Sequence, residues 1–364
     1  MSVVKAEILI IGAGLTGLTL AYLLKKQNFN VVIVEARDRS GGRVHSKKGI
    51  ANSSIELGAT WLAGQHNVLW NLIDTLNLKT FEQKLGETAF YEPLSTSPHQ
   101  LVRLPENNDP SFRIVGGTSS LIDALSKNLN QDNVYYNEQI LSVTEGKEIL
   151  TLKTHSNSYV AKHVVSTLPP NLLVNTMDFQ PKLPENFMAI AKNTHTWMGE
   201  SIKVGLTYEK PFWRNKGMSG TIFSNVGPIP EMYDHTNYEE TSYSLKGFLN
   251  GAYESVKREE RIEMVMQQME KYYGMQARKY ISYEETLWCQ EPYTYSPYNA
   301  QVLPHQNNGA HIYQLPLMNG KLSVAGAETA NAFPGYMEGA VRSAEMIYDR
   351  LVANPQMLKG EIVR

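Results

Sequence analysis

Residues 8–27 read ILIIGAGLTGLTLAYLLKKQ, an apolar run, a glycine-rich turn and a second apolar run with helical spacing. The first four residues are typical of a buried strand, and the residues from Leu18 onward are typical of a helix. Between them, Gly12 allows a tight turn, Gly14 lets the backbone approach a pyrophosphate, and Gly17 lets the helix pack closely on the strand. The N-terminus of such a helix attracts phosphate, because its free N–H groups and its dipole favour an anion.

A second strand, expected over residues 30–34, ends at an acidic residue. Glu35 follows the glycine turn by roughly twenty residues, the spacing at which an acidic side chain binds the ribose hydroxyls of a dinucleotide. A glycine-rich turn alone arises by chance, but here the strand before it, the helix after it and the acid agree. The sequence therefore predicts a domain that binds an adenine dinucleotide.

The block that follows narrows the choice of dinucleotide. Residues 35–44 read EARDRSGGRV, so an arginine near the ribose, Arg37, is followed by a second glycine pair and by Arg43, whose planar fork can bind phosphate. This block resembles the signature of the flavin amine oxidase superfamily, which includes monoamine and polyamine oxidases. The resemblance implies that the cofactor is FAD and that Glu35, Arg37, Gly42 and Arg43 contact it.

Residues 201–208 alternate between apolar and other residues, which is typical of a strand with one exposed face. Lys203 would then point away from the apolar face, and most lysines in that position face solvent. However, the segment through Arg214 resembles the amine oxidase segment in which a strand lysine holds a water against flavin N5. The resemblance implies this catalytic role for Lys203, whose ammonium could stabilise negative charge on the reduced ring and exchange protons.

Near the C-terminal end, residues 322–329 read as a strand, a glycine turn and an acid, and residues 334–340 open a helix. An ordinary amphipathic helix would account for the apolar residues of that helix but not for its glycine-rich entry. In the amine oxidases the turn contacts the ribityl chain and the helix points at the isoalloxazine. The resemblance therefore implies that Glu328 and Met337 bind the cofactor.

The same resemblance implies an aromatic cage and a segment beside the flavin ring. Two tyrosines face each other in monoamine oxidases, and here they correspond to Tyr336 and Tyr298, although Tyr293 or Tyr295 could equally be the partner of Tyr336. The residues that resemble the segment beside the flavin ring are Gly58, Ala59, Thr60 and Trp61, the last of which could instead serve packing alone.

The chain departs from the monoamine oxidases in two places. They link the flavin through a cysteine just before the second cage tyrosine, and here that position is Pro297, so we expect FAD to be bound without a covalent link. In addition, the region between Phe81 and Val115 is far shorter than in larger family members. The pocket is therefore expected to be more open, or to be closed by a second subunit of a homodimer.

Length and composition limit the remaining choices. With 34 basic and 36 acidic residues the net charge is −2, which does not favour a nucleic acid or an anionic membrane as partner. Cys289 is the single cysteine, which excludes an intramolecular disulfide and fits a reducing compartment. No apolar stretch reaches the ~18 residues of a membrane span. We therefore expect a cytoplasmic protein without a membrane anchor that acts on a small molecule.

The expected fold class is α/β, with an FAD-binding domain that is Rossmann-like and of the glutathione-reductase and amine-oxidase type. A smaller α+β domain with a mixed sheet would bind the substrate, since 364 residues suggest about two domains. The FAD-binding domain is expected over residues 1–80, 111–191 and 285–364, and the substrate domain over 81–110 and 192–284.

The resemblance implies an FAD-dependent oxidase acting on amines. A hydride would pass from the α-carbon of the amine to flavin N5, the imine would hydrolyse to an aldehyde or ketone, and dioxygen would be reduced to hydrogen peroxide. Three alternatives stay open at this point: an L-amino acid oxidase, an FAD-dependent desaturase or dehydrogenase, and a flavin-binding protein without turnover.

Overall fold

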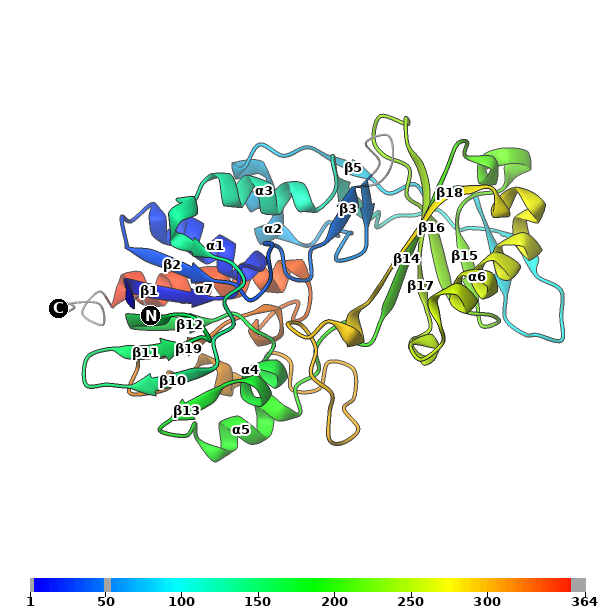
Figure 1. Ribbon diagram of the computed structural model, residues 1–364. Helices are drawn as coiled ribbons and strands as arrows, with labels where there is room; N and C mark the ends of the chain where they lie inside the picture. The colour runs from blue at the N-terminus through cyan, green and yellow to red at the C-terminus, as the bar shows by residue number, and fades with distance from the viewer. Residues whose placement is uncertain (1–2, 49–53, 355–364) are drawn as a thin grey trace.

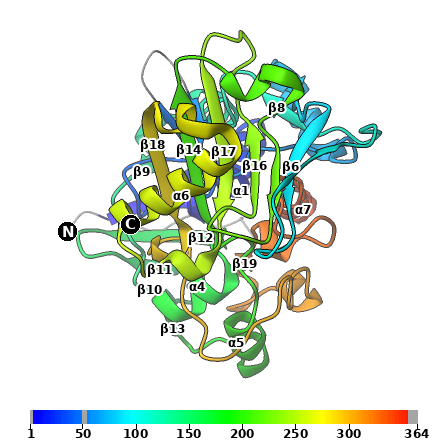
Figure 2. The ribbon, with the colours of Figure 1, turned by 90° about the vertical axis from the view of Figure 1, so that its right-hand side faces the viewer.

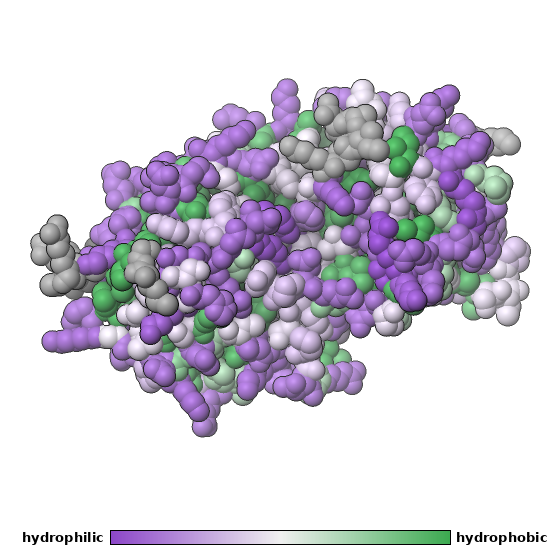
Figure 3. Space-filling view, in the orientation of Figure 1, coloured by the Kyte–Doolittle hydropathy of each residue, from purple (hydrophilic) through white to green (hydrophobic). Residues whose placement is uncertain are grey.

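The computed structural model describes residues 3–48 and 54–354, which form two lobes (Figure 1). The lobe on the left of Figure 1 contains both ends of the described chain and the sheet around β1. The lobe on the right contains the sheet around β14 and β17. No helix in the described ranges is long and apolar enough to span a bilayer. Apolar residues on the face seen in Figure 3 are scattered among polar ones.

The left lobe is built on an eight-stranded sheet in the order β13-β10-β11-β12-β1-β2-β9, with β19 also paired to β12. β1 pairs in parallel with both β2 and β12, and β12 pairs in parallel with β19. The strands of this sheet are β1 (Val3–Ile11), β2 (Val31–Val34), β9 (Val134–Tyr135), β10 (Ser142–Glu145), β11 (Leu150–Lys153), β12 (Ser158–Ser166), β13 (Asp178–Gln180) and β19 (Leu322–Val324).

The inner parts of the central strands are buried, namely residues 8–11 of β1 and the whole of β2, because helices or further strands cover both faces of the sheet there. In β1, Ile8 and Ile10 belong to one core and Leu9 and Ile11 to the other. The core around Ile8 includes residues of α1 (Leu15–Lys25), α2 (Asn67–Thr75), α3 (Ser119–Lys127) and α7 (Met337–Ala353). The core around Leu9 includes residues of α4 (Pro170–Thr176) and α5 (Glu185–Lys192).

The right lobe contains a seven-stranded sheet in the order β18-β14-β17-β16-β15-β6-β7, which is antiparallel except where β15 meets β6. Figure 2 shows α6 (Arg258–Tyr273) lying across one face of it, where Val204, Val265 and Met269 share a core. The strands are β6 (Thr88–Glu92), β7 (Gln100–Arg103), β14 (Ile202–Tyr208), β15 (Ile222–Ser224), β16 (Glu231–Asp234), β17 (Tyr243–Leu249) and β18 (Tyr280–Leu287).

Short elements complete the chain. Two small sheets pair β3 (Ser46–Lys48) with β4 (Ser54–Glu56) and β5 (Thr80–Glu82) with β8 (Phe112–Ile114). Short 3₁₀ helices are η2 (Gln131–Asn133), η3 (Phe212–Gly217), η4 (Gly251–Tyr253), η5 (Gly274–Arg278), η6 (Trp288–Gln290), η7 (His311–Gln314) and η8 (Ala327–Thr329).

The predicted fold class is confirmed, and the structure corrects three local expectations. Helix α1 begins at Leu15 instead of Leu18, because the glycine turn leads directly into its first turn. The stretch between Tyr91 and Ser111, whose four prolines predict an irregular connection, instead contains the paired strand β7 between Pro98 and Pro105. Strand β14 is buried along its whole length, so neither of its faces is open to solvent. The division of the chain between two domains at the expected boundaries stays a prediction.

Candidate active site

A cavity of about 330 Å³ lies between the two lobes. The left lobe contributes the glycine turn after β1, the end of β2 and the start of α7, and the right lobe contributes Lys203 of β14 and Phe248 of β17. The predicted site residues that line it are Gly12, Gly14, Glu35, Arg37, Gly42, Arg43, Gly58, Ala59, Thr60, Trp61, Lys203, Tyr336 and Met337. Gly17, Tyr298 and Glu328 do not line it.

The glycine turn leaves one end of the cavity open to a phosphate group. A Cβ atom on Gly14 would meet nothing within 4 Å, so this backbone borders open space at the N-terminus of α1. A Cβ on Gly17 would lie 2.0 Å from the carbonyl oxygen of Gly12, which is why only glycine fits there. Glu35, buried at the end of β2, accepts N–H bonds from Ala13 at 2.7 Å and from Arg37 at 2.9 Å. These features fit the pyrophosphate and ribose of a dinucleotide.

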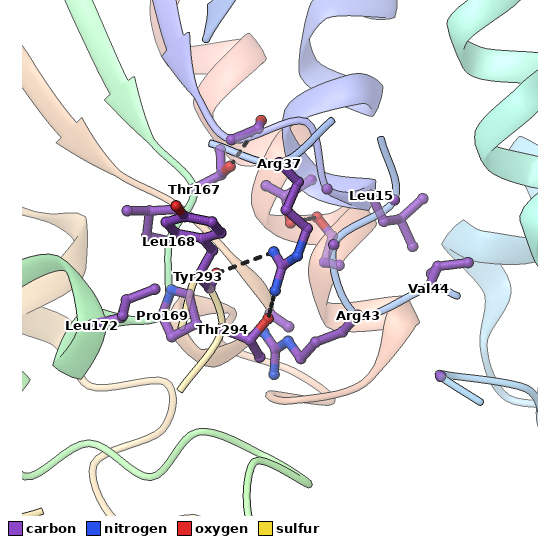
Figure 4. A pocket seen from close by; sticks show the side chains of 18 of the residues that line it. Leu15, Arg37, Arg43, Val44, Thr167, Leu168, Pro169, Leu172, Tyr293 and Thr294 are labelled. Atoms are coloured by element: carbon purple, nitrogen blue, oxygen red, sulfur yellow. Dashed lines mark hydrogen bonds between the residues drawn. The ribbon is translucent and has the colours of Figure 1, made fainter. Parts of the chain in front are cut away.

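Arg37 connects this end of the cavity to the segment after η6 (Figure 4). Its guanidinium donates to the hydroxyl of Thr294 at 2.8 Å, to the carbonyl of Tyr293 at 3.4 Å and to the carboxylate of Glu291 at 2.9 Å. The side chain therefore fastens the 291–294 segment beside the predicted ribose position.

Arg43 and Glu328 bind each other. The two guanidinium nitrogens of Arg43 lie 2.5 and 2.8 Å from the two carboxylate oxygens of Glu328, which is fully buried. Glu328 also accepts the N–H of Trp197 at 3.2 Å. The sequence predicted separate contacts of both residues with the cofactor, whereas the structure shows a bidentate pair in which Arg43 alone reaches the cavity wall.

The 58–61 segment forms the wall between the lobes. A Cβ on Gly58 would lie 2.1 Å from the carbonyl oxygen of Arg43, so a larger residue cannot be placed there. Trp61 donates its indole N–H to Gln83 at 2.9 Å, and its ring lies edge-on to that of Tyr233 at 5.4 Å. Trp61 thus contributes to the wall while its polar atom is bonded elsewhere.

Lys203 is buried, with 5% of its surface exposed, and its amine lies at the cavity. The amine donates to the carbonyl of Gly58 at 2.6 Å and lies 5.1 Å from the ring centre of Phe248. Burial lowers the pKa of Lys203 to about 8, and the charge of Glu56 opposes this shift. At neutral pH the side chain is therefore mostly charged, yet it can lose its proton much more readily than an exposed lysine.

Tyr336 meets aromatic rings other than the predicted tyrosine. Its nearest ring neighbour is Trp197, at 5.6 Å between centroids and 38° between planes, and His305 stacks on Trp197 at 4.1 Å. The hydroxyl of Tyr298 instead accepts the backbone N–H of Thr196 at 2.7 Å, which holds its ring away from the cavity.

The other two candidate tyrosines also lie elsewhere. Tyr293 lines the cavity, but at the Arg37 end, where the guanidinium lies 5.6 Å from its ring centre. Tyr295 donates its hydroxyl to Glu200. None of the three tyrosines between residues 293 and 298 therefore faces Tyr336 in the described part of the chain.

The backbone beside this aromatic wall is strained. Met198, which lines the cavity, has a φ of 59°, and His305 has a φ of 60°. Left-handed backbone is costly for residues other than glycine, so the packing around Met198 must compensate for it. The strain fits a role for the 197–198 segment in the site, but residues away from the cavity, such as Met318 and Phe333, have the same conformation.

Sequence reasoning did not identify Trp197, Met198 or Phe248 as cavity residues. All three come from the part of the chain whose spatial neighbours cannot be deduced without strand register. A sequence signal was available for Lys246, which lies outside the cavity lining, because it stands alone in the otherwise uncharged strand YSLKGFL. A single lysine within such a strand indicates either an edge strand or a buried functional amine.

Comparisons with known proteins identify the family and the fold of the chain. The family model described as flavin-containing amine oxidoreductase matches residues 15–107 and 91–347. A probable flavin-containing monoamine oxidase A from Dictyostelium discoideum is 24% identical over 441 residues, covering 93% of this chain and 95% of the relative. Human amine oxidase [flavin-containing] B is 24% identical over 447 residues, covering 94% of this chain and 85% of the relative.

Among solved structures, putrescine oxidase bound to putrescine superimposes with a TM-score of 0.84 at 22% identity. The match covers 97% of this chain and 100% of that one. Cyclohexylamine oxidase from Brevibacterium oxydans IH-35A has the same TM-score at 19% identity, covering 96% of this chain and 99% of the other. These neighbours have the same two-lobed fold.

Proposed function

The chain belongs to the family of flavin-containing amine oxidoreductases, and from this premise we propose that it oxidises small apolar monoamines. Its cofactor is FAD, and we propose that FAD is held without a covalent bond. The thiol of Cys289 does not line the cavity, and burial raises its pKa to about 11, so it is a poor nucleophile.

The observation that carries the substrate class is that, among the described residues, no free carboxylate or guanidinium lies at the lysine end of the cavity, the end that contains Lys203, Trp197 and Tyr336. Two carboxylates of the described residues line the cavity, those of Glu35 and Glu138. They lie side by side at the dinucleotide end, the end with the glycine turn and the predicted ribose position, because the backbone N–H of Glu138 donates to the carbonyl of Glu35. Within the described residues, no carboxylate reaches the end that contains Lys203 and Tyr336. A diamine would therefore find no partner for its second ammonium group there.

An amino acid fits this end equally poorly. The two arginines on the cavity wall are already bound, Arg37 to Glu291 and Arg43 to Glu328. Neither guanidinium is free to bind a substrate carboxylate. Of the two amines named for the structural neighbours, cyclohexylamine therefore fits this cavity better than putrescine does.

The side chains around the lysine end suit a neutral amine. The rings of Trp197 and Tyr336 form an aromatic wall that attracts an amine nitrogen, and Phe248 and Trp61 add apolar surface. Bound FAD would supply the redox chemistry: the α-carbon of the amine would lose a hydride to it, and two electrons would later pass to an acceptor, for which we propose dioxygen with hydrogen peroxide as the product. Lys203 stabilises the negative charge that this transfer creates and holds a proton at its Nζ atom.

At the other end, the residues serve binding. The N–H groups at the start of α1 would hold the pyrophosphate, and the carboxylate of Glu35 would accept the ribose hydroxyls. Arg43, fixed by Glu328, would orient the middle of the cofactor. We also propose that the protein works in the cytoplasm, where a lone cysteine stays reduced.

The test is anaerobic mixing of the purified yellow protein with benzylamine, putrescine or L-leucine, followed by flavin absorbance. We expect benzylamine to bleach the flavin and the other two to react far more slowly. Bleaching by putrescine or L-leucine at a comparable rate would overturn the proposed substrate class. Bleaching by none of a broad amine panel would favour a flavin-binding protein without turnover.

A further inference from the structure

A second lysine lies behind Lys203. In the antiparallel pairing of β14 with β17, Lys203 is opposite Phe248 and Gly205 is opposite Lys246, so all four residues share the face of the sheet turned toward the cavity. Gly205 has no side chain, and Ile55 of β4 fills the space above it, since a Cβ at Gly205 would lie 2.2 Å from that side chain. The two lysines are therefore diagonal neighbours on one buried surface.

Both amines converge on one carbonyl group. The oxygen of Gly58 accepts from Lys203 at 2.6 Å and from Lys246 at 3.5 Å. Lys246 is fully buried, also donates to the hydroxyl of Thr60, and lies 4.5 Å from the ring centre of Trp61. Lys203 lines the cavity and Lys246 does not, so Lys246 lies directly behind the Gly58–Trp61 wall.

The surrounding charges cannot neutralise two ammonium groups. The one fully buried carboxylate nearby is Glu56, and it is already close to Arg113 at 3.6 Å. His235 adds no positive charge, because its Nε2 accepts the N–H of Glu56 and burial keeps its pKa well below the usual value. Among the described residues, neither lysine has a carboxylate within salt-bridge distance.

The remaining polar groups on this face add no negative charge that could pair with either lysine. Tyr233 of β16 is opposite Lys246 and donates its hydroxyl to Glu231, and Glu284 of β18 is opposite Gly205 and pairs with Lys47 at 2.5 Å. A proton on each lysine would thus place two uncompensated charges in a dry region, which is strongly unfavourable.

We propose that Lys203 and Lys246 act as one site that holds a single proton, with Lys246 as a positioning residue that receives the proton when Lys203 gives it up. The transfer moves one proton from one Nζ atom to the other, while both amines stay hydrogen-bonded to the Gly58 carbonyl, and it involves no electrons. A positive charge then stays next to the cavity whichever amine carries it. In support, burial and the charge of Lys203 lower the pKa of Lys246 well below its usual value.

The first test is a double-mutant cycle on the flavin-loaded protein with Lys203→Met, Lys246→Met and both together. The measured quantity is the reduction equilibrium of the flavin against a reference dye, since positive charge nearby favours the anionic reduced form. We expect each single variant to shift the equilibrium constant by less than about tenfold and the double variant by about a hundredfold or more. Lys321→Met, at a lysine paired with Glu145 in the other lobe, is the control and should change nothing.

Two outcomes overturn the proposal. If Lys203→Met shifts the equilibrium as much as the double variant, Lys203 holds the charge alone. If the two single shifts multiply to give the double shift, the lysines are charged independently. Lys246→Gln, which keeps a polar group near Thr60, replaces Lys246→Met if the methionine variant does not fold.

The first test rests on the proposed function because it needs bound flavin. A second test therefore uses the protein without flavin. Unfolding at pH 7 should bind about one proton on account of Lys246, which is neutral when folded and charged when unfolded. Lys203→Met should abolish this uptake, because Lys246 then carries the proton in the folded state. Uptake that persists in Lys203→Met but not in Lys246→Met would overturn the shared proton, even if no amine is ever oxidised.

Discussion

The dinucleotide end and the lysine end of the cavity differ in which part of the chain recognises the ligand. At the first, one continuous stretch from Gly12 to Arg43 supplies backbone N–H groups, a buried carboxylate and glycines that leave space. At the second, side chains from five separated segments meet, represented by Trp61, Trp197, Lys203, Phe248 and Tyr336. Binding at the first end therefore depends on local backbone geometry, whereas chemistry at the second depends on strand register and burial.

The largest expected effect is on stability and flavin binding, and it comes from changing the glycine turn at the dinucleotide end of the cavity. Gly17→Ala would place its Cβ 2.0 Å from the carbonyl of Gly12, and we expect a loss of about 2–3 kcal/mol in the free energy of unfolding together with loss of bound flavin. Urea unfolding and the visible absorbance of the purified protein measure both. Gly14→Ala has free space around its Cβ, so it should fold normally but bind flavin weakly.

The matched control is Gly64→Ala, whose Cβ would have its nearest neighbour at 4.0 Å and which lies outside the cavity. It should retain both flavin and stability. If Gly14→Ala binds flavin as tightly as the control does, the phosphate does not lie at this turn.

The next largest effect is expected from removing the amine of Lys203 at the lysine end of the cavity. Lys203→Met should leave flavin bound while slowing flavin reduction or reoxidation by about a hundredfold, because it removes the lysine amine that reaches the cavity and can hold a proton there. Stopped-flow absorbance separates the two half-reactions. Lys210→Met, on the exposed residue after the same strand, serves as the control. Unchanged rates in both half-reactions would remove Lys203 from the site.

The buried lysines also predict how stability depends on pH. A lysine whose pKa is lowered in the folded state binds its proton more tightly when unfolded, so its contribution to stability improves as pH rises from the folded toward the unfolded pKa. With the pKa of Lys203 at about 8, the free energy of unfolding should rise by about 1 kcal/mol between pH 8 and pH 9 from this residue, and the lowered pKa of Lys246 adds to the rise in the same direction.

Urea unfolding at both pH values should show this rise in the wild type relative to the double variant Lys203→Met/Lys246→Met. Equal pH dependence of the two proteins would contradict the buried, shifted amines.

A smaller effect is expected at the aromatic wall. Trp197→Ala should raise KM for an aromatic monoamine by about tenfold and leave flavin binding unchanged, because it removes one of the rings beside Tyr336. Trp197→Phe should recover most of the loss. Steady-state oxygen consumption measures both variants, and a KM unaffected by Trp197→Ala would mean that substrate binds elsewhere.

The smallest effect is expected at the tyrosine that the sequence favoured. Tyr298→Phe removes one hydrogen bond to Thr196 outside the cavity, so we expect KM and kcat to change less than about twofold and stability to fall by about 1 kcal/mol. A large change in KM would return Tyr298 to the substrate site.

Most of the dinucleotide end was predictable because its determinants are local. Gly12, Gly14, Glu35 and Arg43 were identified from spacing and from the family resemblance, and all four line the cavity. The pairing of Arg43 with Glu328 was not predicted, since it joins residues far apart in the sequence. The burial of β14 was also misjudged, because a strand that alternates in sequence can still be covered on both faces.

The sequence by itself determined the glycine turn, the acid after β2, the fold class and a lysine strand of the amine oxidase type, because each depends on residues close together in the chain. The tertiary structure decided that Trp197 and not Tyr298 faces Tyr336, and that Lys246 lies behind Lys203. Those contacts depend on how β14 pairs with β17 and on how the 195–198 segment bonds to its neighbours. Such pairings are long-range choices of register and packing, which no local pattern of residues specifies.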